Sequence, residues 1–467
     1  MTVSRKIIPV AVMVLLLAAS CAPRVRLRSW APDVKKGLND FISSTGPGEY
    51  AVFDFDNTCT IFDISEQLMI YQLETMSFAM LPERFQEVFP YFPGLYDSLW
   101  VRYGPFSAAG VSEETAAVMH GDPLWKRFAV EMGRSYFTLQ QWMGPDEAYL
   151  KTLGWYTGMT GDELYGLAAR SHRKYSAVET TPGTWETDGD SHSWIDGISV
   201  TDNIRELWKA LHRRGCGIWV CSASEIAPVL AAVDVFGLHD YCTGVVAICM
   251  ERDSLDRYGP AFDNGGCAFL AGPDGTWVRD TLPMGSQPIG PGKVDAILGA
   301  IAPGYGGRGP SAGFMDATGD FNFCTEFASM RLCVCFNRAS RKVTDGGGLI
   351  AEVAMYEKDF LGYDLAGAGA AGDTYYLLQG RDENGLRTLR PSNATIRFGE
   401  SSEKLFAGEE NQLMLNYFRS DSLSVRDILD TYSIRTPADA PGNPFGFAYG
   451  FLERYDGYRS MEDPQNP

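Results

Sequence analysis

Short apolar runs alternate with helical segments along much of the chain, and this alternation most constrains the fold. Each run is four to six residues long and rich in β-branched or aromatic side chains, as in strands buried on both faces. Strands that alternate with helices pair in parallel, because each helix returns the chain to the same end of the sheet. The sequence therefore predicts an α/β fold with a doubly wound parallel sheet, whose strands are Ala51–Phe55, Gly217–Cys221, Gly244–Cys249, Phe314–Ala317 and Leu332–Phe336.

Helix signals fill the intervals between these runs. After a Thr201 N-cap, apolar side chains repeat at helical spacing until Gly215 ends the pattern. We expect a turn-rich insert from the end of the third strand to about Pro291, and an edge strand at Tyr375–Leu378. Further helices are expected over Val34–Ile42, 225–236 and 293–301.

Polar and acidic residues collect where three of the predicted strands end. Asp54 and Asp56 end the first strand, Ser222 follows the second, and Gly319-Asp320 follow the fourth. Open α/β sheets bind ligands outside the carboxyl ends of their strands, so these residues predict a site. Asp54 and Asp56 are two apart and share one side of an extended chain, where their charges repel unless a positive group lies between them.

These residues belong to four motifs that resemble those of the haloacid dehalogenase superfamily of phosphatases. Asp54 to Thr58 (DFDNT) matches the DxDxT first motif, and Ser222 after GIWVC matches the second. Lys293 in GPGKVDAI matches the third, and Gly319-Asp320 after GFMDAT matches the start of the acidic fourth motif. The matches follow the family's order over roughly residues 50–337, whereas a turn rich in Asp and Asn would explain the first motif alone.

The resemblance implies Mg²⁺-dependent hydrolysis of phosphomonoesters through an aspartyl-phosphate. Asp54 would be the nucleophile, and Asp56 the acid/base that protonates the leaving alcohol and later activates water. Asp54, the backbone carbonyl of Asp56, and Asp320 would hold Mg²⁺, which prefers oxygen ligands and relieves carboxylate repulsion. The motif residues that would bind the substrate are Thr58, Ser222, Ala223 and Lys293.

The stretch 64–199 lies between the first and second motifs, and we expect a helical cap domain there. A cap at this point is similar to that of phosphoserine phosphatases and bacterial phosphocholine phosphatases, which implies a small phosphomonoester substrate of that type. Glu66 would meet the substrate's amino group, or would be a helix-start acid favoured by the dipole. The aromatic residues within Phe89–Tyr96 and Gly154–Thr160 would hold a quaternary ammonium group, or would fill the core of the cap.

The fourth motif departs from the family's pattern. Relatives carry a second acid four or five residues after the first, but Cys324 and Thr325 occupy those positions after Asp320. Because a thiol is a poor Mg²⁺ ligand, Glu326 or Asp316 would have to replace that acid. The alternative is a catalytically weak relative that acts as a ligand-binding lipoprotein; the enzyme is favoured because the other three motifs are intact.

The N-terminus resembles a bacterial lipoprotein signal. A short basic region precedes the apolar stretch Ile7–Ala19, and LAASC ends at Cys21, which would become the lipidated N-terminus. The alternative is an ordinary secretory signal that ends beside a cysteine. In either case we expect an exported protein, and with the lipid an anchor in a bacterial membrane, on its periplasmic or cell-surface side.

Composition limits the partners. The net charge of −19 argues against nucleic acid, which requires a basic face. The cysteine spacing shows no zinc pattern. The predicted division is a signal peptide at 1–21, a core formed by 22–63 and 200–340, the cap at 64–199, and a C-terminal extension at 341–467 that packs on the core.

Overall fold

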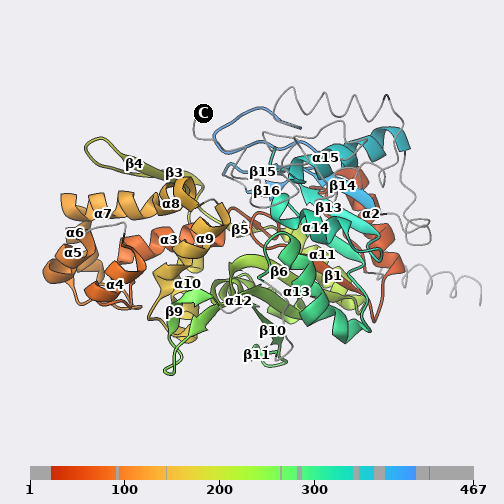
Figure 1. Ribbon diagram of the computed structural model, residues 1–467. Coiled ribbons are helices and arrows are strands. Elements are labelled where there is room, and N and C mark those ends of the chain that lie inside the picture. Colours follow the sequence, from red (N-terminus) through yellow and green to blue (C-terminus); the bar gives the residue numbers. More distant parts are fainter. Residues whose placement is uncertain are drawn as a thin grey trace, which may run out of the picture.

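An eight-stranded, mostly parallel sheet forms the centre of the protein (Figure 1). The computed structural model describes residues 23–90, 94–143, 145–262, 266–280, 287–339, 346–361, 374–385, 387–405 and 420; the predicted signal segment and Cys21 lie outside them. In spatial order the strands are β11 (Trp277–Arg279), β10 (Cys267–Ala271), β7 (Gly244–Ile248), β6 (Gly217–Glu225), β1 (Tyr50–Phe53), β12 (Ala312–Met315), β13 (Leu332–Phe336) and β14 (Tyr375–Gln379). The strands from β7 to β14 pair in parallel, and β10 and β11 add an antiparallel edge.

Helices cover both faces of this sheet, which confirms the doubly wound α/β prediction. Alternate residues of β1 divide between two apolar clusters: Ala51 and Phe53 join one, and Tyr50 and Val52 join the other. The first cluster includes residues of α2 (Pro32–Ser44), α11 (Asp202–Arg213) and α12 (Ile226–Val235). The second includes residues of α13 (Pro291–Ala296), α14 (Phe321–Thr325) and α15 (Gly346–Tyr356).

Helix α11 illustrates how local sequence sets an element. The Thr201 hydroxyl accepts the N–H of Ile204 at 3.3 Å and caps the first turn. The apolar positions predicted from the spacing are buried, and Gly215 ends the segment with a φ of 75°. Only glycine adopts that conformation without steric cost, so the predicted stop is confirmed.

The segment that follows the first motif forms a separate helical body, to the left of the sheet in Figure 1. Its own apolar cluster is rich in aromatic side chains. The chain enters and leaves this body side by side, because β2 (Thr60–Ile61) pairs with β5 (Ser199–Val200). Its helices are α3 (Ile64–Thr75), α4 (Pro82–Val88), α5 (Leu95–Tyr103), α6 (Glu113–His120), α7 (Pro123–Gly133), α8 (Ser135–Met143), α9 (Pro145–Thr152), η1 (Leu153–Tyr156) and α10 (Gly161–Ser176).

Two segments differ from the sequence predictions. The expected helical cap also contains a β-hairpin, β3 (Thr181–Glu186) and β4 (Ser191–Asp196), which has an exposed polar face. The expected turn-rich insert contains a second hairpin, β8 (Met250–Arg252) and β9 (Tyr258–Phe262), as well as the edge strands β10 and β11. These strands are short and separated by turn residues, so their periodicity is too brief to outweigh the turn signals.

The C-terminal part completes the other edge of the sheet. The predicted edge strand is confirmed as β14, which pairs in parallel with β13. After it, β15 (Arg381–Asp382) pairs with β16 (Thr388–Leu389). Short helical turns complete the elements: η2 (His239–Tyr241), η3 (Ile297–Ile301), η4 (Ala302–Tyr305), η5 (Thr318–Asp320) and η6 (Glu357–Leu361). Among the described residues, no helix combines the length and apolar character needed to cross a bilayer.

Candidate active site

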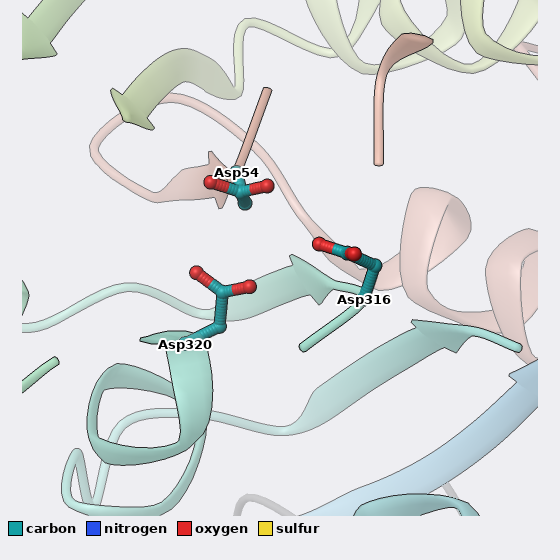
Figure 2. Close-up of side chains that lie close together, drawn as sticks. All are labelled: Asp54, Asp316 and Asp320. Carbon is teal, nitrogen blue, oxygen red and sulfur yellow. The ribbon is translucent and has the colours of Figure 1, made fainter. Parts of the chain in front are cut away.

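Three buried aspartates converge at the carboxyl edge of the sheet (Figure 2). Asp54 follows β1, Asp316 follows β12, and Asp320 immediately precedes α14. One carboxylate oxygen from each lies within 4.8 Å of those from the other two. Since β1 and β12 are neighbouring parallel strands, their carboxyl ends meet here, and the N–H of Asp54 bonds to the carbonyl of Phe314 at 3.0 Å.

Lys293 partly neutralises this triad. Its ammonium group donates to an oxygen of Asp54 at 2.7 Å and to one of Asp320 at 2.5 Å. Burial alone would lower the pKa of Lys293, but the Asp320 and Asp54 carboxylates outweigh it and raise that pKa well above its usual value. Lys293 comes from α13, where the third motif was expected.

The Lys293 ammonium group and the Arg338 guanidinium, which donates to Asp316 at 3.1 Å, do not fully offset three buried carboxylates. Burial, together with the nearby charge of Asp54, raises the pKa of Asp320 well above its usual range and that of Asp316 to about 7. A divalent cation would remove this repulsion, and carboxylate oxygens are the donors that Mg²⁺ prefers. The donor set therefore fits a Mg²⁺ ion held by Asp54, Asp316 and Asp320.

Asp56 lies beside the triad, but its side chain belongs to a different network. Its two oxygens accept the N–H of Ile64 at 2.7 Å and the hydroxyl of Ser224 at 2.6 Å. Burial, and then the charge of Asp63, raises the pKa of Asp56 well above its usual value. Both effects favour the protonated form of the Asp56 carboxyl group. The predicted metal contact through its backbone carbonyl stays a prediction.

The loop after Asp56 is held by a residue far away in the chain. Asn57 has a φ of 59°, a left-handed conformation that asparagine tolerates better than most residues. Arg381 donates to the Asn57 backbone carbonyl at 2.7 Å and to its side-chain oxygen at 3.1 Å. The guanidinium is itself paired with Glu383, at 2.9 and 2.7 Å, so the buried charge is compensated.

The other predicted substrate-binding residues lie around the triad and Asp56. The Thr58 hydroxyl donates to Asp316 at 3.2 Å, and the buried Ser222 hydroxyl accepts the N–H of Ser224 at 3.1 Å. Ala223 is half-buried between these serines on the last residues of β6. Contact of Thr58, Ser222 or Ala223 with a substrate stays a prediction.

The acid missing after Asp320 is present before it. Asp316 and Asp320 are four residues apart, and both contribute to the triad. The predicted strand Phe314–Ala317 includes Asp316, but β12 ends at Met315. Cys324 instead lies in the second apolar cluster. Its sulfur lies close to the backbone of Gly313, so that a Cβ added to this glycine would be 3.1 Å from the sulfur.

Three site residues had weak sequence signals. Arg338 follows β13 and donates to Asp316 at 3.1 Å, so it lies at the carboxyl end of the next strand of the sheet. For Arg338, this position shortly after a strand was the sequence signal that indicated a site residue. Ser224 lies two residues after Ser222 in the second motif, and that position is its sequence signal. For Arg381, nothing nearby in the sequence indicates a partner in the first motif.

A cavity of about 330 Å³ adjoins the entrance to the cap segment. Ser65 lines it and lies 3.0 Å from Ser224, the hydroxyl that donates to Asp56, so hydroxyl groups link the cavity to Asp56. Glu66 also lines it, and although its side chain is exposed toward the cavity, burial raises its pKa to about 7. The other lining residues are Asp63, Met69, Gly133, Tyr136, Phe137, Tyr149, Thr152, Leu153, Trp155, Tyr156 and His192.

The two aromatic segments separate in the structure. Phe89 and Tyr96 pack within the aromatic cluster of the cap, as the core-filling alternative predicts. Trp155 and Tyr156 belong to that cluster too, but they also line the cavity. Residues 91–93 of the first segment lie outside the described residues. Of the described aromatic residues in the two segments, only Trp155 and Tyr156 line this cavity.

Comparisons with known proteins show the fold and no family. No protein-family model and no curated protein matches the sequence. A conserved, functionally unknown protein from Anaerococcus prevotii DSM 20548 is 19% identical, with a TM-score of 0.60, over 79% of this chain and 98% of that one. A cytosolic 5′-nucleotidase IIIB bound to cytidine is 14% identical over 66% and 78% of the two chains, and its TM-score of 0.31 supports neither a shared fold nor a shared activity. The first likeness shows that this α/β architecture exists in a solved structure.

Proposed function

We propose that the protein is a Mg²⁺-dependent phosphatase of the haloacid dehalogenase type that hydrolyses small phosphomonoesters. The observation that carries this proposal is the triad of Asp54, Asp316 and Asp320, with Lys293 bonded to two of its members. Phosphoryl transfer requires an in-line nucleophile, a proton donor and concentrated positive charge. Asp54, Asp56 and Lys293 supply these three elements, and a bound Mg²⁺ would add charge neutralisation at the phosphoryl oxygens.

The proposed reaction has two steps. An oxygen of Asp54 attacks phosphorus, the bond from phosphorus to the ester oxygen breaks, and Asp56 gives its proton to the leaving alcohol. Asp56, now ionised, then takes a proton from water, which attacks the aspartyl-phosphate and releases inorganic phosphate with Asp54 restored. The raised pKa of Asp56 suits the first role, because the residue must arrive protonated. Ser224 and the N–H of Ile64 orient its carboxyl group.

The cavity suits a small alcohol that carries an amino or quaternary ammonium group. It is about 330 Å³ in volume, and it combines aromatic walls with the carboxyl group of Glu66. Aromatic faces with an acid attract organic cations. The hydroxyl chain through Ser65 and Ser224 leads from this cavity to Asp56, which would protonate the leaving group. These features support phosphoserine, phosphoethanolamine or phosphocholine as the type of substrate.

Phosphate release from a panel of esters tests the proposal. We expect Mg²⁺-dependent release from the three amino-alcohol phosphates, slower release from glycerol phosphate, and little from a phosphoprotein. Asp54→Asn should abolish release while the far-UV spectrum and melting temperature stay unchanged. Wild-type rates in Asp54→Asn would refute the nucleophile assignment.

Glu66→Gln tests the substrate class separately. It should raise the KM for phosphoethanolamine by about tenfold, since an ion pair worth about 1.4 kcal/mol is lost, and leave glycerol phosphate unaffected. Glu83→Gln, an exposed acid on α4, is the matched control. A phosphatase that does not discriminate between these esters would refute the amino-alcohol assignment and leave the phosphatase assignment intact.

The ligand-binding alternative predicts a different result. A catalytically weak protein would bind the ester without releasing phosphate, and calorimetry would record binding for wild type and Asp54→Asn alike. The intact triad, together with an acid that can hold a proton, favours the enzyme.

A further inference from the structure

A basic surface lies on the core, formed by α11 and the first described residues. Arg24, Arg26 and Arg28 alternate along an extended segment and are all exposed. Lys209 and Arg213 are exposed on α11, and Arg205 is half-buried one turn before Lys209. Five of these six side chains line a groove of about 610 Å³: Arg24, Arg26, Arg205, Lys209 and Arg213.

The positive charge of this surface is largely uncompensated. Within the described part of the chain, no ion pair joins a carboxylate to Arg24, Lys209 or Arg213. Two acids, Asp202 and Glu206, also line the groove. The Glu206 carboxylate is partly satisfied, because it accepts the N–H groups of Arg26 at 2.7 Å and Leu27 at 3.1 Å. Five basic side chains and two acids line the groove, where Arg205 and Asp202 lie 4.0 Å apart, and this excess of positive charge stands out in a chain whose net charge is −19.

We propose that this basic surface binds the anionic phospholipid headgroups of a membrane. Arg24 is three residues after Cys21, so a fully extended chain separates them by at most ~10 Å. A lipid on Cys21 would hold Arg24, a residue of the groove, within about one Debye length of the headgroups at 0.1 M salt. The surface would fix which face of the protein lies on the bilayer. This proposal does not depend on the proposed phosphatase activity.

The charge distribution selects this partner over a free polyanion. At 0.1 M salt, charges more than about 10 Å away are screened. A planar bilayer at this face would therefore interact mainly with the charges of the basic surface. A long nucleic acid would extend past the groove and meet the acidic remainder of a chain with a net charge of −19.

Vesicle cosedimentation tests the proposal with the unlipidated chain from Ala22 onward, which contains all described residues. At 0.1 M salt we expect binding to phosphatidylcholine vesicles containing 30% phosphatidylglycerol, and none to pure phosphatidylcholine. Each basic residue near an anionic surface adds on the order of fivefold in affinity, so Lys209→Glu with Arg213→Glu should weaken binding by about tenfold or more. The matched control is Lys126→Glu with Arg84→Glu on cap helices α7 and α4, which should bind like wild type.

Three outcomes would overturn the proposal. The first is equal binding to both vesicle types. The second is an equal loss in the groove and cap variants, with both folded by circular dichroism. The third is that inorganic phosphate releases the protein from the vesicles, or that a DNA duplex binds the protein, at matched ionic strength. Either result would show that the groove binds a soluble anion.

Discussion

Arg381 should stabilise the loop that follows Asp56, although 324 residues of sequence separate Arg381 from Asn57 in that loop. We consider Arg381→Met, which keeps much of the side-chain length and removes the guanidinium. The substitution deletes two hydrogen bonds to Asn57 and two to Glu383. The side chains of Arg381 and Glu383 are only 2% and 9% exposed, so water cannot replace what is lost.

The expected loss in unfolding free energy is about 3–5 kcal/mol, because removing one partner strands the buried carboxylate of Glu383. The double variant Arg381→Met/Glu383→Gln should recover about 1–3 kcal/mol of it, since a neutral amide is cheaper to bury. Neither variant restores the bonds to Asn57, next to Asp56. Phosphate release should therefore stay low in both, even where stability recovers.

Urea unfolding and phosphate release measure the two effects separately. The matched control is Arg331→Met, which breaks a half-exposed pair with Glu49 at the opposite end of the sheet. It should cost about 1 kcal/mol or less and leave the rate unchanged. If Arg381→Met is no less stable than the control, or if the double variant regains full activity, Arg381 does not hold the loop.

Four further predictions follow from the site and the core. Asp316→Asn should raise the Mg²⁺ concentration for half-maximal phosphate release by about tenfold or more. Glu326→Gln, at a residue outside the triad, should leave that concentration unchanged. Equal effects of the two substitutions would show that Asp316 does not bind the ion. Cys324→Asp should lower the urea midpoint without improving Mg²⁺ dependence, because it buries a carboxylate among apolar side chains; a lower Mg²⁺ requirement would contradict this. His172 donates from Nε2 to the Pro228 carbonyl, and burial lowers its pKa to about 4 from 6.5, so stability should fall as pH drops below about 6.5. Protonation of His172 should lower the unfolding free energy by about 2 kcal/mol by pH 5. If the unfolding free energy of His172→Gln falls as steeply with decreasing pH as that of wild type, His172 is not the cause. Cys21→Ser should remove lipid labelling and reduce membrane association at unchanged specific activity, as fractionation and a phosphate assay would record.

The central sheet was predictable because its strands are buried on both faces. Leu332–Phe336 is a continuous apolar run and coincides with β13. Ala51–Phe55 is apolar except for Asp54, and its first three residues lie in β1. The antiparallel edge strands β10 and β11 were not predictable in the same way, although the opposite edge strand, β14, was. Cys267–Ala271 pairs in the sheet, but its neighbouring turns dominate the local pattern.

The site was predictable where it depends on strand ends and not where it depends on distant contacts. Asp54 and Lys293 meet as the motifs imply, at 2.7 Å. Asp316 was misplaced because a shift of two residues in the end of one strand decides whether a side chain lies in the strand or after it. No local pattern could have paired Asn57 with Arg381, since only the completed fold brings them together.

The bond between Asn57 and Arg381 spans 324 residues, and this separation has a consequence for biosynthesis. Chains grow at about 5–20 residues per second, so roughly 16–65 s pass between the synthesis of the two residues. Within that interval, β13 is complete 39 residues before β14 begins, so its outer edge lacks a partner for roughly 2–8 s at this rate. An unpaired edge invites association with other chains. A polypeptide interrupted between these strands would carry all four sequence motifs, yet it would be both inactive and prone to aggregate. The nascent chain should therefore depend on chaperones until its last strand is made.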